Sequence, residues 1–154
     1  SAIERRWLSE HPELFAESPQ ALEIFRSMSD ELMKRTRNNP GKAPEAYAAL
    51  LRALVRSRET IGRERFTGAF SGLFTACYEN LALLTVPQGK LLYPALVDFY
   101  SWTGDREKQN KLREYSALMS QEELRKLEQE RSWPGHTLEA LRRLFPAPEA
   151  AAER

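Results

Sequence analysis

The sequence predicts an all-α fold, a single-domain bundle or array of six to seven helices arranged as helical hairpins. Apolar residues recur at spacings of three and four along most of the chain, a pattern typical of amphipathic helices. Short segments rich in Asn, Gly and Pro separate these stretches, and no convincing strand pattern interrupts them. The 154 residues suit one domain that buries its own core. We therefore expect a domain over residues 1–145 and a flexible tail over 146–154.

A buried central helix is predicted over about residues 63–84. The stretch 66–102 carries three formal charges, whereas charged residues make up 29% of the whole chain. Eight apolar residues in the first half of this stretch fall at helical spacings of three and four: Phe66, Phe70, Leu73, Phe74, Cys77, Tyr78, Leu81 and Leu84. A helix that is apolar over so wide a face is expected to lie in the core.

Proline and glycine mark the boundaries of the helices that precede the central one. Ser18 and Pro19 suit the N-cap and first position of a helix, because the N–H that proline lacks has no helical partner there. That helix is expected to end at residues 38–41, and Pro44 to begin the next one. Gly62 then interrupts or bends the chain before the central helix.

Residues 86–89 are predicted to form a turn after the central helix. The spacing of apolar residues favours a helix over 91–102, although its aromatic and β-branched residues leave a strand open, and Pro94 suits only the first turn of a helix. Ser120 and Glu123 match a capping box, which predicts a helix start. The remaining predicted helices cover residues 105–119, about 120–131, and the segment from its cap at Thr137 to 145.

The sequence offers no constellation of catalytic or metal-binding residues. His11 and His136 lie near opposite ends of the chain, and Pro12 interrupts the carboxylates around His11 that would be needed for a shared metal. Cys77 lies on the apolar face of the central helix, where a thiol is expected to act as a small core residue. Gly-rich phosphate loops, Gly-x-Ser-x-Gly elbows and Cys-x-x-Cys pairs are also absent from the sequence. We predict that the protein is not an enzyme and uses no metal or cofactor.

Hydropathy indicates no association with a membrane. No apolar run reaches the roughly 18 to 20 residues that a membrane helix needs. The first residues lack the apolar core of a signal peptide. A single cysteine fits a reducing compartment. We therefore expect a cytoplasmic protein.

Charge is distributed unevenly although the net charge is only +1. Residues 1–33 contain three basic and seven acidic groups, whereas residues 34–65 contain nine basic and three acidic groups. Arginine favours bidentate recognition of carboxylates and phosphates. The candidate partner-binding ridge consists of Arg52, Arg56, Arg58, Arg63 and Arg65. Pairing of this basic block with the acidic first helices is the alternative interpretation.

Trp102 and Trp133 are candidate aromatic anchors, because both stand beside helix breaks and tryptophan is enriched in interaction hot spots. Together with the arginines they favour a helical adaptor, regulatory or assembly domain that binds another protein, or a second copy of itself. The alternative is nucleic-acid backbone binding through the arginine-rich segment 52–65, with affinity that falls steeply with salt. A small-ligand pocket near residues 93–102 is a third hypothesis.

Overall fold

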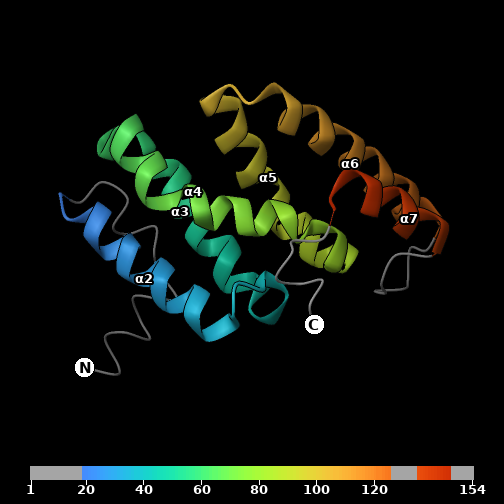
Figure 1. Cartoon of the computed structure of the whole chain (residues 1–154), viewed down its shortest axis with the longest axis horizontal. Helices are drawn as coiled ribbons and strands as arrows, with labels where there is room; N and C mark the ends of the chain where they lie inside the picture. The colour runs from blue at the N-terminus through green and yellow to red at the C-terminus, as the bar shows by residue number, and fades with distance from the viewer. Residues whose placement is uncertain (1–18, 126–134, 147–154) are drawn as a thin grey trace. The chain divides into compact units, whose positions relative to one another are not determined.

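The computed structural model describes residues 19–125 and 135–146, with side chains for 19–122 and 137–146. These residues form six α-helices and two short 3-10 helices without a strand, so the all-α prediction is confirmed (Figure 1). The α-helices are α2 (Ala21–Thr36), α3 (Pro44–Ile61), α4 (Arg63–Glu79), α5 (Val86–Thr103), α6 (Arg106–Arg125) and α7 (Gly135–Leu144). The 3-10 helices are η2 (Pro40–Lys42) and η3 (Leu81–Leu83).

The chain falls into two compact units that divide after Ala76, within α4. The first unit contains α2, η2, α3 and most of α4. The second contains the last three residues of α4 followed by η3, α5, α6 and α7. The single domain over 1–145 stays a prediction.

In the first unit, α2 and α3 form a hairpin through η2 (Figure 1). α2 begins at Ala21 after a turn at Pro19 and Gln20, which is later than the predicted start. It ends as predicted, with Arg37 in the left-handed region at φ 53° and the Asn38 N–H donating to the Met33 carbonyl at 2.9 Å. This Schellman-type ending satisfies carbonyls that the last helical turn leaves open.

A buried hydroxyl pair joins the two helices of this hairpin. The Thr36 Oγ1 and Tyr47 Oη atoms lie 2.7 Å apart, and both residues are buried. Thr36 also donates to the Leu32 carbonyl at 2.7 Å, so the Tyr47 hydroxyl donates to Thr36. Buried polar groups are tolerated when they are paired in this way. Phe25 and Leu51, both fully buried, supply apolar packing in the same unit.

Gly62 separates α3 from α4, as predicted, with a φ of 94° that side-chain-bearing residues rarely adopt. The predicted central helix begins at Arg63 but ends at Glu79 rather than about residue 84. The 3-10 helix η3 follows α4, and a capping box then begins α5: Thr85 Oγ1 accepts from the Gln88 N–H at 3.3 Å, and Gln88 Oε1 accepts from the Thr85 N–H at 3.0 Å.

This capping box also corrects two predictions for α5. Residues 86–89 are not a turn but the first turn of the helix, with Pro87 near its start. Pro94 therefore lies in the helix interior rather than in the first turn, and its ring is exposed. The strand alternative for this segment is wrong, because the helix runs without interruption to Thr103.

α6 is a single helix from Arg106 to Arg125, so the predicted break at Ser120 is wrong. Asp105 begins this helix by accepting from the Lys108 N–H at 3.1 Å. Ser120 is instead an exposed residue within the helix, between buried Met119 and Glu122. No glycine or proline interrupts α6. Thr137 lies inside α7 rather than capping it, because α7 begins at Gly135.

Aromatic rings from four segments pack together in the second unit. The Tyr78 ring meets those of Tyr100 and Phe145 edge-on, with centroids 5.4 and 5.1 Å away. The Phe145 ring also meets Tyr115 at 5.6 Å and 89°. Such edge-to-face pairs are favourable beyond the burial of area alone. Gly89 makes this packing feasible, because a Cβ there would stand 1.7 Å from the Tyr115 hydroxyl.

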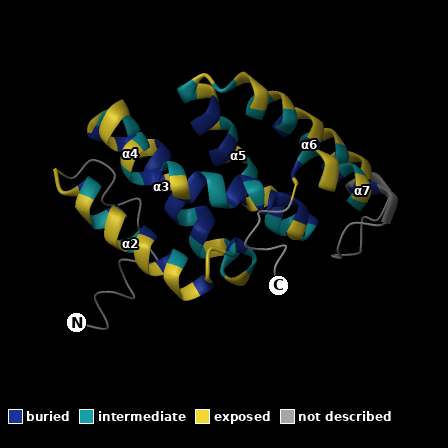
Figure 2. Ribbon diagram, viewed as in Figure 1, coloured by how far each residue is buried: buried dark blue, intermediate teal, exposed yellow. Residues whose placement is uncertain are grey.

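Burial follows the helical periodicity in both units (Figure 2). In α2, for example, Phe25, Ser29 and Leu32 are buried, while Arg26 and Asp30 are exposed. Within the described ranges, no helix combines the length and hydropathy that crossing a bilayer requires.

Candidate protein-binding surface

Arg52 and Arg56 lie one turn apart on the exposed side of α3. Residues at this spacing share a helix face and have Cβ atoms about 6 Å apart. Buried residues on the opposite side, including Leu51 and Leu54, direct this face outward. The two guanidinium groups therefore form a pair of neighbouring cationic positions on one rigid element.

Arg58 does not extend this pair. Its side chain is half-buried, and its Nη1 donates to the Val55 carbonyl of the same helix at 2.5 Å. Among the described residues, its buried Nε has no hydrogen-bond partner. The guanidinium thus serves the carboxyl end of α3, where a cation complements the helix dipole.

Arg63 and Arg65 occupy the exposed first turn of α4. The change of chain direction at Gly62 places them on a different helix from Arg52 and Arg56. The five predicted residues therefore divide into an exposed pair on α3, an exposed pair on α4, and a half-buried Arg58. We name the four exposed residues, Arg52, Arg56, Arg63 and Arg65, the arginine surface.

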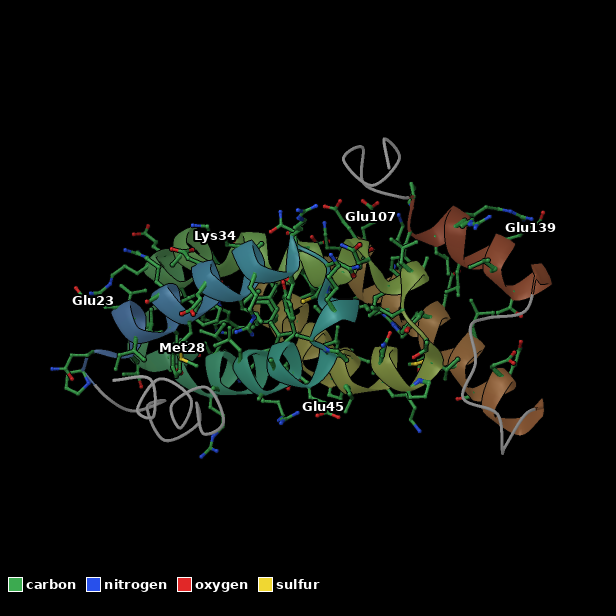
Figure 3. The ribbon with its side chains drawn as sticks, turned by 90° about the horizontal axis from the view of Figure 1, so that it is seen from below. Glu23, Met28, Lys34, Glu45, Glu107 and Glu139 are labelled. Atoms are coloured by element: carbon green, nitrogen blue, oxygen red, sulfur yellow. The ribbon has the colours of Figure 1, made fainter. Side chains whose placement is uncertain are left out.

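A second basic group surrounds the end of α2, and the candidate ridge did not include it. Lys34, Arg35, Arg37 and Lys42 are all exposed. Basic residues near a helix C-terminus interact favourably with its dipole, which accounts for part of this group. A shallow depression along α2 is lined by residues of both charges, between Glu23 and Lys34. Figure 3 labels Glu23 and Lys34, which lie at its two ends.

Of the two candidate tryptophan anchors, the structure describes one. Trp102 is half-buried in the last turn of α5, in the second unit. Trp133 lies outside the described residues, as do His11 and the side chain of His136.

Exposed leucines are a surface feature that sequence reasoning missed. Leu83 is 55% exposed in η3, and Leu91 is 40% exposed in α5, whereas Leu81 and Leu92 beside them are buried. The predicted helix began at residue 91, whereas α5 begins at Val86. With that later start, the spacing of apolar residues did not show which of these leucines is buried and which is exposed. The capping box formed by Thr85 and Gln88 was the available clue.

A cation–aromatic cluster marks the junction of α5 and α6. Lys108 Nζ lies 5.5 Å from the Tyr78 ring centroid, 5.7 Å from that of Tyr100, and 3.1 Å from Asp105 Oδ2. Burial, followed by the charges of Asp105, Glu107 and Glu79, raises the pKa of Tyr78 to about 12. These contacts join neighbouring segments of the fold and give Lys108 a structural role.

Among the described residues, the cysteine lies in the core and no metal-binding cluster forms. Cys77 is fully buried, and this burial raises the pKa of its thiol far above the ordinary value. The described residues contain no group of three His, Cys, Asp or Glu side chains that could hold a metal ion.

Comparison with protein-family models, with curated proteins and with solved structures finds no match to this chain. Function therefore has to be inferred from the described residues themselves.

Proposed function

We propose that this protein is a non-enzymatic interaction module that binds an acidic segment of another protein through the arginine surface. The observation that carries the proposal is the exposed pair Arg52 and Arg56, one turn apart on a helix whose other side is buried. Two guanidinium groups held in this way can each form a bidentate contact with a carboxylate. Carboxylates one helical turn apart on a partner helix have the matching spacing.

The charge of the first unit supports an acidic partner. Residues 1–76, which make up this unit, include twelve basic and ten acidic side chains, a net charge of +2. Residues 77–154 of the second unit include eleven basic and twelve acidic side chains, a net charge of −1. Long-range attraction of an acidic partner would thus be directed to the first unit, and would increase the association rate.

Two features favour a protein over a nucleic-acid backbone. Glu45 and Glu59 are exposed on the same face of α3 as Arg52 and Arg56, seven residues before the first arginine and three after the second. A continuous chain of phosphates would meet these carboxylates, whereas a protein surface of mixed charge can complement them. No aromatic side chain of the first unit's described part is exposed for base stacking.

The test uses fluorescence anisotropy with a labelled helical peptide that carries glutamates at i,i+4 spacing. Single-stranded RNA and duplex DNA serve as competing probes, at about 50 and 200 mM salt, a range over which phosphate contacts weaken steeply. We expect the wild-type protein to bind the peptide, and the double variant Arg52→Glu/Arg56→Glu to lose at least about tenfold in affinity, or about 1.4 kcal/mol.

The matched control is Arg106→Glu/Arg113→Glu, which makes the same change in charge at exposed positions of α6. Retained peptide binding by this control would locate recognition on α3. An equal loss in both variants would show a response to net charge alone and refute the proposal. Tighter binding of nucleic acid than of the peptide, abolished by the α3 variant, would establish the alternative function instead.

A further inference from the structure

The outward face of α5 is apolar at its centre and charged at its edges. Positions 87, 90, 91, 94, 98 and 101 share this face by helical geometry. Pro87 is half-exposed, and Lys90, Leu91, Pro94, Asp98 and Ser101 are exposed. This set is called the α5 face below. Leu83, more than half exposed, lies just before it in the chain.

Both ends of α5 and its inner side hold the α5 face in a defined orientation. The capping box of Thr85 and Gln88 begins the helix, and the Gly104 and Asp105 N–H groups close it by donating to the Tyr100 carbonyl, each at 3.0 Å. Leu92 and Leu96 are fully buried on the inner side. A fixed surface loses little conformational entropy when it is covered, which favours association.

The charges of the α5 face are self-complementary. Lys90 lies four residues before Pro94, and Asp98 lies four residues after it. In an antiparallel pair of α5 helices centred on Pro94, each Lys90 lies at the height of the partner's Asp98, and the long lysine side chain can reach it. Leu91 and Pro94 occupy the middle of such a pair. A two-fold interface requires this kind of self-complementarity.

We propose that the α5 face binds a second copy of this chain, forming an antiparallel two-fold dimer about Pro94. A second copy is inferred as the partner because Lys90 and Asp98 lie at equal distances on either side of Pro94. An unrelated apolar partner would not need this arrangement of charges. The face extends over about 21 Å of helix from Pro87 to Ser101. One helix pair of this length buries less area than a stable dimer of standard size, so the dimer is weak and depends on concentration. The inference is independent of the proposed function, which uses the first unit.

Sedimentation velocity over a concentration series tests the dimer. We expect the sedimentation coefficient of the full chain to rise between about 10 µM and 1 mM, the range expected of a small interface. Lys90→Glu and Asp98→Lys should each raise the dissociation constant at least about tenfold, because two symmetric contacts become repulsive. The double variant Lys90→Glu/Asp98→Lys restores complementary charges and should dimerise like the wild type.

The double variant Lys90→Glu/Asp98→Lys distinguishes loss of this interface from a general effect of misfolding or of changed net charge on dimerisation. Arg113→Glu, at an exposed position of α6, is the matched control and should leave the dimer unchanged. A wild-type chain that stays monomeric up to about 1 mM would overturn the proposal. Failure of the double variant to restore dimerisation, with its helical circular dichroism intact, would equally overturn it.

Discussion

In the first unit, the ring of Phe66 contacts those of Phe70 and Phe74 along a single helix, with centroids 5.2 and 6.1 Å away. In the second unit, ring contacts join residues far apart in the chain, such as Tyr78 with Phe145. The first pattern follows from helical spacing, whereas the second depends on how separate helices pack. Tight packing of large rings leaves little free volume, so the second unit should tolerate added atoms poorly.

The surfaces of the two units differ as well. The first unit carries a net charge of +2 and presents arginines on α3 and α4, whereas the second unit carries a net charge of −1 and exposes Leu83 and Leu91. Charged and apolar surfaces recognise different partners. The two proposals correspond to this difference: the first unit is proposed to bind an acidic partner, and the second is proposed to bind a second copy of the chain.

The largest effect is expected from Gly89→Ala in the second unit. Its Cβ would stand 1.7 Å from the Tyr115 hydroxyl, and the fully buried Tyr115 has rings of Tyr93 and Phe145 beside it. We expect a loss of about 2–3 kcal/mol in the free energy of unfolding, measured by urea denaturation.

Two variants make this prediction specific. Adding Tyr115→Phe to Gly89→Ala removes the clashing oxygen but leaves Cζ at 3.0 Å, so stability should recover only in part. Gly72→Ala, at an exposed position of α4 with no atom within 4 Å of the new Cβ, is the first-unit counterpart. It should stabilise the protein by about 0.5–1 kcal/mol. Equal effects of the two alanines would remove the packing difference between the units.

A middle-sized effect is expected at the two Schellman-type helix ends. Arg37 and Gly104 occupy equivalent left-handed positions after α2 and α5, with φ of 53° and 78°. A Cβ costs about 1 kcal/mol in this conformation, and space around Gly104 is open, so Gly104→Ala should destabilise the protein by about that amount. Arg37→Gly should stabilise it by up to about 1 kcal/mol, as thermal melting would show. Destabilisation by Arg37→Gly would mean that the contacts of its side chain outweigh backbone strain.

The smallest effect concerns acid sensitivity, which should arise at the α5–α6 hairpin rather than at the α2–α3 hairpin. Partial desolvation raises the pKa of Asp105, but two hydrogen bonds from Lys108 and its charge outweigh this and lower it overall. A carboxyl with a lowered pKa stabilises the fold above its unfolded pKa of about 3.9, and this contribution is lost as pH falls through the folded pKa.

Asp105→Asn should therefore reduce stability slightly at pH 7, and the difference from wild type should shrink below about pH 4. Urea midpoints at a series of pH values measure this difference. Asp98→Asn, at an exposed position that caps no helix, is the control. A difference between Asp105→Asn and wild type that persists unchanged at acidic pH would contradict an ionic role for Asp105.

Local patterns predicted the helices well, but several boundaries were wrong where two local signals compete. Ser120 and Glu123 resemble a helix start, yet α6 continues through them because buried Met119 and Glu122 keep the helix packed. Conversely, Thr85 and Gln88 form a capping box within the segment that was predicted to be a turn. Because the helix start was therefore predicted too late, Pro94 was assigned to the first turn although it lies in the helix interior. A capping motif begins a helix only where the preceding residues can leave the helical conformation.

The candidate site was predictable only as a set of charges. Counting residues located the basic block, but it could not distinguish the exposed Arg52 and Arg56 from Arg58, whose guanidinium donates to Val55. The predicted break at Gly62, by contrast, already placed Arg63 and Arg65 on a different helix from Arg52 and Arg56, as the structure has them. Side-chain exposure depends on neighbouring elements, which lie outside any local window.

The sequence by itself determined the all-α class, the break at Gly62 and the uneven charge, because helical periodicity, backbone sterics and composition act locally. Only the tertiary structure decided which leucines of the segment 81–92 are exposed and which aromatic rings meet Phe145. Those outcomes depend on contacts between residues distant in the chain, because the volumes and orientations of side chains from separate helices must be compatible for close packing.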